Sequence, residues 1–161
     1  MAPSKAGERL IYLPLGGAGE IGMNAYVYGY GMPGKERLIL VDLGVAFPDM
    51  DGSPGVDLIM ADISWLTARL DRLEAIFITH GHEDHIGAIP YLAADLGVPL
   101  YATPFTAGLI RGKLEEEGLS QEVELRILPM EGSCTIGPFG CELVPLAHSI
   151  PEMSAVVITT P

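Results

Sequence analysis

The sequence contains only two cysteines, Cys134 and Cys141, among its 161 residues. Small secreted domains that depend on disulfide bonds need more cysteines than this, so we expect no disulfide framework. No stretch approaches the roughly 18 to 20 consecutive apolar residues of a membrane-spanning helix. The N-terminal residues MAPSKAGERL also lack the apolar segment of a secretory signal. We therefore expect a soluble, cytoplasmic protein with no membrane partner.

Basic residues are also scarce. The chain has 9 lysines and arginines against 21 aspartates and glutamates, and its formal net charge is −12. Domains that bind nucleic acids usually present a basic surface, so the composition by itself does not favour RNA or DNA as a partner. It does not exclude one either, because two bound divalent metals would reverse the sign of the charge locally.

The apolar residues predict a single domain of mixed α/β structure. Hydrophobic residues make up 48% of the chain, enough for a buried core. Short apolar or β-branched runs predict strands, and their consecutive order indicates much antiparallel pairing. The predicted strands are residues 10–15, 24–30, 37–44, 75–79 and 98–102, and four more in ELRILP, SCTIG, CELVPLA and SAVVITT.

Helices are predicted between some of these strands. Asp62 can cap a first helix that carries four apolar residues on one face, Ile63, Leu66, Leu70 and Leu73. Pro90 suits the first turn of a second helix, which Gly97 ends. A third helix is predicted over residues 103–118, and the segment 45–57 is predicted to be a loop because of its prolines, glycines and aspartates.

A glycine motif after the first strand matches the dinucleotide-binding fingerprint in spacing. Gly17, Gly19 and Gly22 stand in GGAGEIG, and Asp42 ends a later strand. The fingerprint requires a helix whose N-terminus faces the pyrophosphate, whereas the following NAYVYGYG has the composition of a strand. We favour a tight turn between two strands. The alternatives are a turn that brings backbone close to an active site, and a nucleotide site.

Three of the four histidines lie in one short segment, THGHEDHIGA, residues 79–88. In an extended backbone, His80 and His82 point to the same side together with Asp84, so they can reach one metal. His85 follows where the chain turns toward a helix, and one compact loop can serve two metals. Imidazole and carboxylate ligands suit zinc, manganese or iron. A polar surface loop is the weaker alternative, because these residues follow a buried strand directly.

Two residues elsewhere in the chain are candidates for the same site. His148 ends a strand in PLAHSIPE and can supply a third ligand, which leaves a position for water. Asp42 ends the strand LILVD and can orient a ligand histidine and fix its tautomer. The alternatives are a structural histidine and an aspartate that begins a turn. Glu20 and Asn24, in the glycine turn, are candidates for lining the cleft and receive no chemical role.

The loop FPDMDGSPGVD, residues 47–57, contains three aspartates. Their oxygen atoms suit a hard cation such as calcium. A solvated loop is the favoured interpretation, and a calcium site is the alternative.

These motifs together resemble the metallo-β-lactamase superfamily, and within it the RNase J family of the β-CASP group. The pattern H-x-H-x-D-H followed by a later histidine is specific only to the superfamily. The flanking residues resemble the N-terminal part of RNase J over nearly the whole chain: PLGGAGEIGMN, VDLG, THGHEDHIGAIPYL and HSIPE. The resemblance implies an α/β fold, the αββα sandwich, with two metals at the edge between its sheets. It implies a metal-dependent ribonuclease that hydrolyses phosphodiester bonds both internally and from the 5′ end.

The resemblance also implies a role for each candidate residue. The implied metal ligands are His80, His82 and His148 for one metal, and Asp84 and His85 for the second. The implied catalytic residues are Asp84, His85 and Asp42. Zinc is the expected metal and manganese the alternative. RNA is the expected substrate, and a homodimer or homotetramer is the expected assembly.

Several parts of the RNase J pattern have no counterpart in these residues. The pattern includes an aspartate that bridges both metals after a strand like SAVVITT, a further histidine ligand, a β-CASP domain and a C-terminal domain. We therefore expect residues 1–161 to be the N-terminal part of a metallo-β-lactamase domain, with little or no nuclease activity alone. The alternatives are another hydrolase of this fold, acting on thioesters or lactams, and a non-catalytic metal-binding half-domain.

Overall fold

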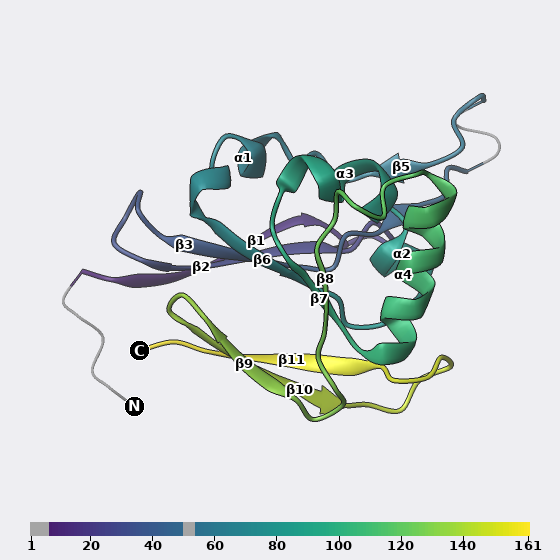
Figure 1. Cartoon of the computed structure of the whole chain (residues 1–161). Coiled ribbons are helices and arrows are strands. Elements are labelled where there is room, and N and C mark those ends of the chain that lie inside the picture. The colour runs from purple at the N-terminus through teal and green to yellow at the C-terminus, as the bar shows by residue number, and fades with distance from the viewer. Residues whose placement is uncertain (1–6, 50–53) are drawn as a thin grey trace.

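The computed structural model describes residues 7–49 and 54–161 of the chain. Two β-sheets face each other, and the helices cover the outer side of the larger sheet (Figure 1). The larger sheet has the strand order β1-β2-β3-β6-β7-β8, and the smaller one has the order β11-β10-β9. The described residues thus form three successive layers, helices, sheet and sheet, of the αββα arrangement that the family resemblance implied.

The larger sheet changes from antiparallel to parallel pairing at its centre. Its strands are β1 (Arg9–Gly16), β2 (Ala25–Gly31), β3 (Arg37–Val41), β6 (Leu73–Phe77), β7 (Leu100–Ala102) and β8 (Leu125–Ile127). The first three pair antiparallel, whereas β3, β6, β7 and β8 run parallel. Parallel strands end at the same edge of a sheet, where α/β proteins place their sites. The loops that follow β3 and β6 therefore emerge side by side.

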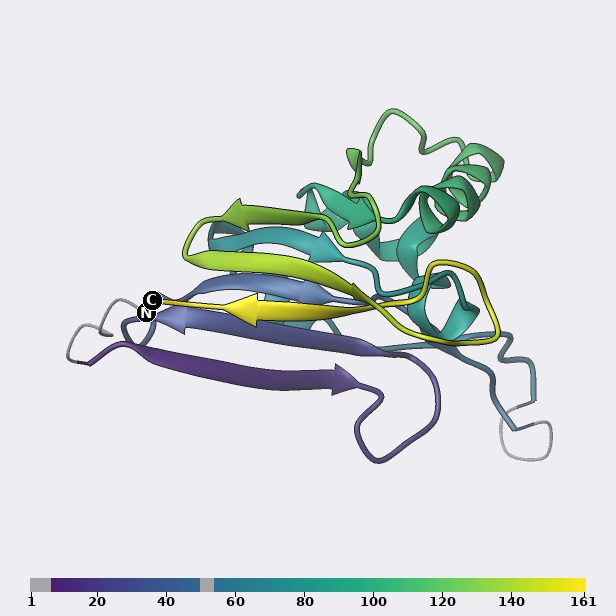
Figure 2. The same ribbon diagram turned by 90° about the horizontal axis from the view of Figure 1, so that it is seen from below.

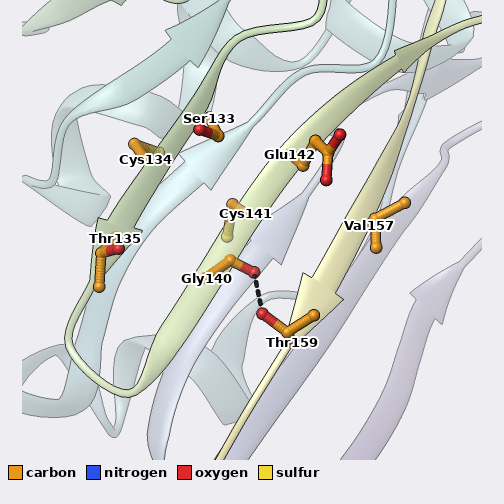
Figure 3. Close-up of a pocket in the computed structure, with 8 residues that line it drawn as sticks. All are labelled: Ser133, Cys134, Thr135, Gly140, Cys141, Glu142, Val157 and Thr159. Atoms are coloured by element: carbon orange, nitrogen blue, oxygen red, sulfur yellow. Dashed lines mark hydrogen bonds between the residues drawn. The ribbon is translucent and has the colours of Figure 1, made fainter. Parts of the chain in front are cut away.

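The smaller sheet is an antiparallel meander of β9 (Ser133–Ile136), β10 (Phe139–Pro145) and β11 (Ser154–Thr159). Cys134 and Cys141 are free and lie opposite each other on β9 and β10. Burial raises the pKa of Cys141 to about 12, so this thiol is unreactive at neutral pH. A shallow hollow lies over the same strands and is lined by residues such as Glu142 and Val157 (Figure 3). No histidine is among its lining residues.

Two hydrophobic clusters hold the layers together. One lies between the helices and the larger sheet and includes Leu40, Ile76 and Ile110. The other lies between the two sheets and includes Phe77 and Phe139. The smaller sheet does not reach across β1 (Figure 2), and two β1 side chains, Leu10 and Tyr12, are 60% and 54% exposed.

The predicted helix over residues 62–73 is wrong. The structure has a short α1 (Ser64–Thr67), a 3-10 turn η1 (Leu70–Arg72), and then Leu73 as the first residue of β6. Asp62 Oδ1 accepts a hydrogen bond from the Ser64 N–H but caps no longer helix. Leu73 pairs with Leu38 of β3, and this sheet contact outweighs the helical spacing of the leucines.

The other predicted helices are confirmed, and one was missed. Helix α3 (Ile89–Leu96) has Pro90 in its first turn and ends at Gly97, whose φ of 63° is left-handed. Helix α4 (Pro104–Glu116) follows Thr103. The missed helix is α2 (Glu83–Ile86), a single turn within the histidine motif. Among the described residues, none of the helices has both the length and the apolar composition needed to cross a membrane.

The segment predicted as a loop over residues 45–57 contains a short strand. Strand β4 (Val45–Ala46) pairs with β5 (Ile59–Met60). The aspartate-rich part considered for calcium includes residues 50–53, which lie outside the described residues. The glycine motif forms a turn between β1 and β2 rather than opening a helix, with φ values of 82°, 83° and 92° at Gly17, Gly19 and Gly22. The nucleotide interpretation is therefore wrong.

Gly44 marks the closest approach between the loop after β3 and the histidine segment. A Cβ atom at this position would overlap the carbonyl group of Asp84, which is backbone and cannot move independently. We predict that Gly44→Ala destabilises the protein by about 3 kcal/mol, the upper range for overpacking. The measurement is urea unfolding followed by circular dichroism.

Gly108→Ala is the matched control, because a Cβ atom there meets nothing within 4 Å. Gly108 is inside helix α4, where alanine should raise the free energy of unfolding by about 0.5–1 kcal/mol. Equal stability of the two variants would contradict the close approach at Gly44.

Candidate metal centre

Three imidazole rings converge at the edge where β6 and β10 end. His80 Nε2 lies 3.2 Å from His82 Nδ1, and His148 Nε2 lies 3.2 Å from the same atom. One ring nitrogen from each residue lies within 4.8 Å of the other two. Two nitrogens at zinc-ligand distances in a tetrahedral site are about 3.3 Å apart. The spacing therefore fits a single divalent metal held by three histidines.

The buried position of His80 keeps it in the form that can bind a metal. Its side chain is one of the few buried polar groups, with an exposed fraction of 2%. Burial is the main reason that the pKa of His80 falls to about 4, and the neighbouring imidazoles act in the same direction. A neutral imidazole has the free lone pair that a metal requires, so His80 itself needs no deprotonation at neutral pH.

Asp42 fixes the orientation of His85. Its Oδ2 atom lies 2.7 Å from His85 Nδ1, and its Oδ1 atom accepts a hydrogen bond from the Thr79 N–H at 2.8 Å. Asp42 has a φ of 63°, an uncommon value for a residue other than glycine. Burial opposes a positive charge on His85, but the hydrogen bond and the charge of Asp42 raise its pKa. In the neutral ring, a carboxylate at this distance favours the tautomer with its proton on Nδ1, which leaves the lone pair on Nε2.

Asp84 and His85 form a second pair of donors. Asp84 Oδ2 lies 3.4 Å from His85 Nε2, a separation that two ligands of one metal can have. The rings of His80 and His85 are 4.0 Å apart between centroids, so the two groups of donors are neighbours. The Asp84–His85 pair therefore lies directly beside the three-histidine group.

Asn24 contacts both members of this second pair. Its Nδ2 atom donates to Asp84 Oδ2 at 3.1 Å and lies 3.2 Å from His85 Nε2. Tyr26 donates its hydroxyl to Asn24 Oδ1 at 2.7 Å, which sets the direction of the amide. The sequence offered one hint of this role, the position of Asn24 between the glycine turn and β2. Glu20 instead accepts a local hydrogen bond from the Gly17 N–H.

The loop of His148 is anchored by Glu152, a second residue that the sequence left without a role. Glu152 Oε2 accepts a hydrogen bond from the Phe105 N–H at 2.7 Å, at the start of helix α4. The loop closes through the Leu146 N–H, which donates to the Met153 carbonyl. Glu152 has a φ of 58°. A non-glycine residue in this region indicates a turn held by its surroundings.

A model of the metallo-beta-lactamase superfamily matches residues 18–148, which include all six candidate residues. The chain belongs to the metallo-beta-lactamase superfamily. Solved structures agree with this fold. The chain is similar to a subclass B3 metallo-beta-lactamase of Bradyrhizobium japonicum, with a TM-score of 0.55, 19% identity, and coverage of 87% of this chain and 53% of that one. Zinc-bound PqqB of Methylobacterium extorquens has a TM-score of 0.53, 16% identity, and coverage of 85% and 49%.

Relatives with higher sequence identity confirm the resemblance to the RNase J family. Ribonuclease J of Sinorhizobium meliloti is 49% identical over 95% of this chain, which corresponds to 27% of that protein. Ribonuclease J of Thermus thermophilus is 40% identical over 92% of this chain and 26% of its own length. The chain thus spans about a quarter of the length of these two relatives.

The structure brings together every residue proposed for the site from the sequence: Asp42, His80, His82, Asp84, His85 and His148. The donor set suits divalent metal binding, as expected for the metallo-beta-lactamase superfamily. The individual roles of these residues as ligands or catalysts stay predictions.

Asn24→Ala should selectively weaken a metal held by Asp84 and His85. The variant removes the amide that positions both side chains, and loss of such a supporting contact costs about tenfold or more in metal affinity. The three-histidine group should keep its affinity. Cobalt(II) titration of the longer protein, after its own metal has been removed, separates the two binding steps by visible absorption. Tyr26→Phe should weaken cobalt(II) binding at Asp84 and His85 by a smaller factor, and Tyr91→Phe should leave this binding unchanged. Equal weakening of both steps would contradict the role of Asn24.

Glu152→Ala should weaken binding at the three-histidine group instead. It releases the His148 loop from helix α4, and we expect about tenfold lower cobalt(II) affinity there. Glu152→Gln keeps an oxygen acceptor for the Phe105 N–H and should bind cobalt(II) nearly as the unchanged protein does. The free energy of unfolding should fall by about 1 kcal/mol in the alanine variant. Lower stability with unchanged metal affinity would show that Glu152 only caps the helix.

Proposed function

We propose that the chain supplies the metal-binding part of a ribonuclease active site that hydrolyses RNA phosphodiester bonds with two divalent ions. Zinc is the proposed metal, because three imidazoles with an open fourth position are a zinc ligand set, and manganese is the alternative. The observation that supports the proposal most directly is the convergence of His80, His82 and His148 at 3.2 Å spacings beside the Asp84–His85 pair.

The residues divide the work between holding ions and orienting ligands. We assign His80, His82 and His148 to one ion, and Asp84 and His85 to the other. Divalent ions in such sites lower the pKa of water and neutralise charge on the phosphate. Asp42 would keep a proton on His85 Nδ1 through its 2.7 Å contact, which would leave Nε2 available to the second ion.

RNA is the proposed substrate because of the relatives named Ribonuclease J. We propose that the longer protein hydrolyses RNA both from the 5′ end and internally. The net charge of −12 would repel RNA phosphates. In the proposed enzyme, bound cations supply the local positive charge at the cleavage site.

We propose that residues 1–161 are the N-terminal part of a metallo-β-lactamase domain, completed by further ligands, a β-CASP domain and a C-terminal domain. The proposed assembly is a homodimer or homotetramer located in the cytoplasm. Residues 1–161 alone are proposed to bind metal with little or no cleavage.

Metal content and RNA cleavage, measured on the same preparations, test this function. We expect about one tightly held zinc or manganese per 161-residue chain, lost in His148→Ala. The longer protein should hold about two ions and cleave a labelled RNA. His80→Ala should lower cleavage by more than about 100-fold, because even supporting contacts outside the ligand set cost up to this much.

The outcomes separate the proposed function from its alternatives. Metal-loaded longer protein that leaves RNA intact but hydrolyses a thioester or a lactam would indicate another hydrolase of this fold. Metal binding without turnover of any of these substrates would indicate a non-catalytic half-domain. Rapid, metal-dependent cleavage by residues 1–161 alone would contradict the proposed need for further ligands.

A further inference from the structure

An apolar hollow opens directly beside the histidine cluster. Its volume is about 530 Å³, and its lining includes Ile21, Gly22, Ala46, Phe47, His82 and Asp84. This volume lies within the usual range for small-ligand sites. Two of the lining residues, His82 and Asp84, are also proposed metal ligands. The hollow is therefore continuous with the position where a bound phosphate would be cleaved.

The outer wall of the hollow exposes large apolar side chains to water. Ile21 is 95% exposed and Phe47 is 66% exposed. Single exposed apolar residues are common, but apolar side chains gathered around a hollow beside polar groups are typical of binding sites. Phe47 offers an aromatic ring, which is a platform for another flat ring.

The walls are built from tightly packed backbone. Gly22 has a φ of 92°, and a Cβ atom there would lie 2.9 Å from the Ala46 Cβ. The Met23 N–H donates to the Val45 carbonyl at 2.8 Å. The glycine turn and strand β4 are thus joined at a fixed distance. This places Ile21 and Phe47 at the hollow without a rearrangement of the backbone.

The charges around the hollow favour an uncharged occupant. Among the described residues that line it, Glu83 and Asp84 are acidic and none is lysine or arginine. Glu83 is already paired with Lys113 at 2.7 Å. The hollow therefore offers an RNA phosphate no cation of its own, whereas its apolar walls suit a flat, neutral ring.

We propose that this hollow binds the base of the nucleotide next to the phosphate that is cleaved, with the base stacked on Phe47. The proposal rests on the proposed ribonuclease function and adds a substrate subsite to it. Every base has a flat π face, so stacking of this kind tolerates any sequence. Stacking on one aromatic residue changes affinity by about tenfold. The contact is therefore expected to act on KM and to leave kcat nearly unchanged.

Fluorescence of 2-aminopurine tests the subsite without relying on turnover. The probe is a single-stranded RNA in which every linkage is a cleavage-resistant phosphorothioate, with one 2-aminopurine that is moved position by position along the strand. With the metal-loaded longer protein, we expect quenching at one position, that of the base next to the phosphate at the metal centre. Phe47→Ala should weaken this binding by about tenfold, whereas Phe47→Trp should retain it. Ile127→Ala is the control, because Ile127 is also an exposed apolar residue (48%) but lies on β8. This variant should bind the probe as the unchanged protein does.

An RNA that lacks one base provides the matching kinetic test. Removal of the base at the quenched position should raise KM about tenfold for the unchanged protein and have no further effect on Phe47→Ala. Two results would contradict the subsite even if RNA is still cleaved. One is equal quenching in the unchanged protein and in Phe47→Ala, and the other is an unchanged KM for the RNA that lacks the base. Failure of the metal-loaded protein to cleave any RNA would overturn the proposed function, and the subsite with it.

Discussion

The candidate site depends on one buried carboxylate, that of Asp42. It is 2% exposed and accepts hydrogen bonds from the backbone and side chain of Thr79, while it also contacts His85 Nδ1. A buried carboxylate is costly unless such partners satisfy it. Because β3 and β6 are parallel neighbours, Asp42 and Thr79 follow their ends side by side. The same contacts that compensate for burial of the carboxylate therefore hold the histidine segment against the sheet.

Close backbone packing extends this arrangement to the glycine turn. The Asn24 N–H donates to the Asp84 carbonyl, and the Gly44 N–H donates to the Asn24 carbonyl. Three segments that are distant in the sequence thus meet through main-chain hydrogen bonds, which satisfy backbone groups that would otherwise be buried without partners. Gly44 leaves the space that this contact requires. One consequence is that the walls of the apolar hollow and the donors of the metal centre share the same backbone support.

Much of the fold could be predicted from local patterns, but not the parts that depend on distant contacts. The strand in LILVD and the helix with Pro90 in its first turn were predicted because their signals lie within a few residues. The helix over residues 62–73 was wrong because Leu73 pairs with β3. Asn24 and Glu152 received no role, since their partners, Asp84 and Phe105, are 60 and 47 residues away.

The sequence by itself determined the chemistry of the donors: imidazole and carboxylate groups crowded into residues 80–85, directly after a buried strand. Side-chain periodicity in an extended segment is a local property, so His80 and His82 could be assigned to one metal from spacing alone. Only the tertiary structure decided that His148, 66 residues from His82, comes within 3.2 Å of it. That approach requires the smaller sheet to pack on the larger one and Glu152 to tie the loop to α4. Both result from the packing of the whole domain, which no short segment encodes.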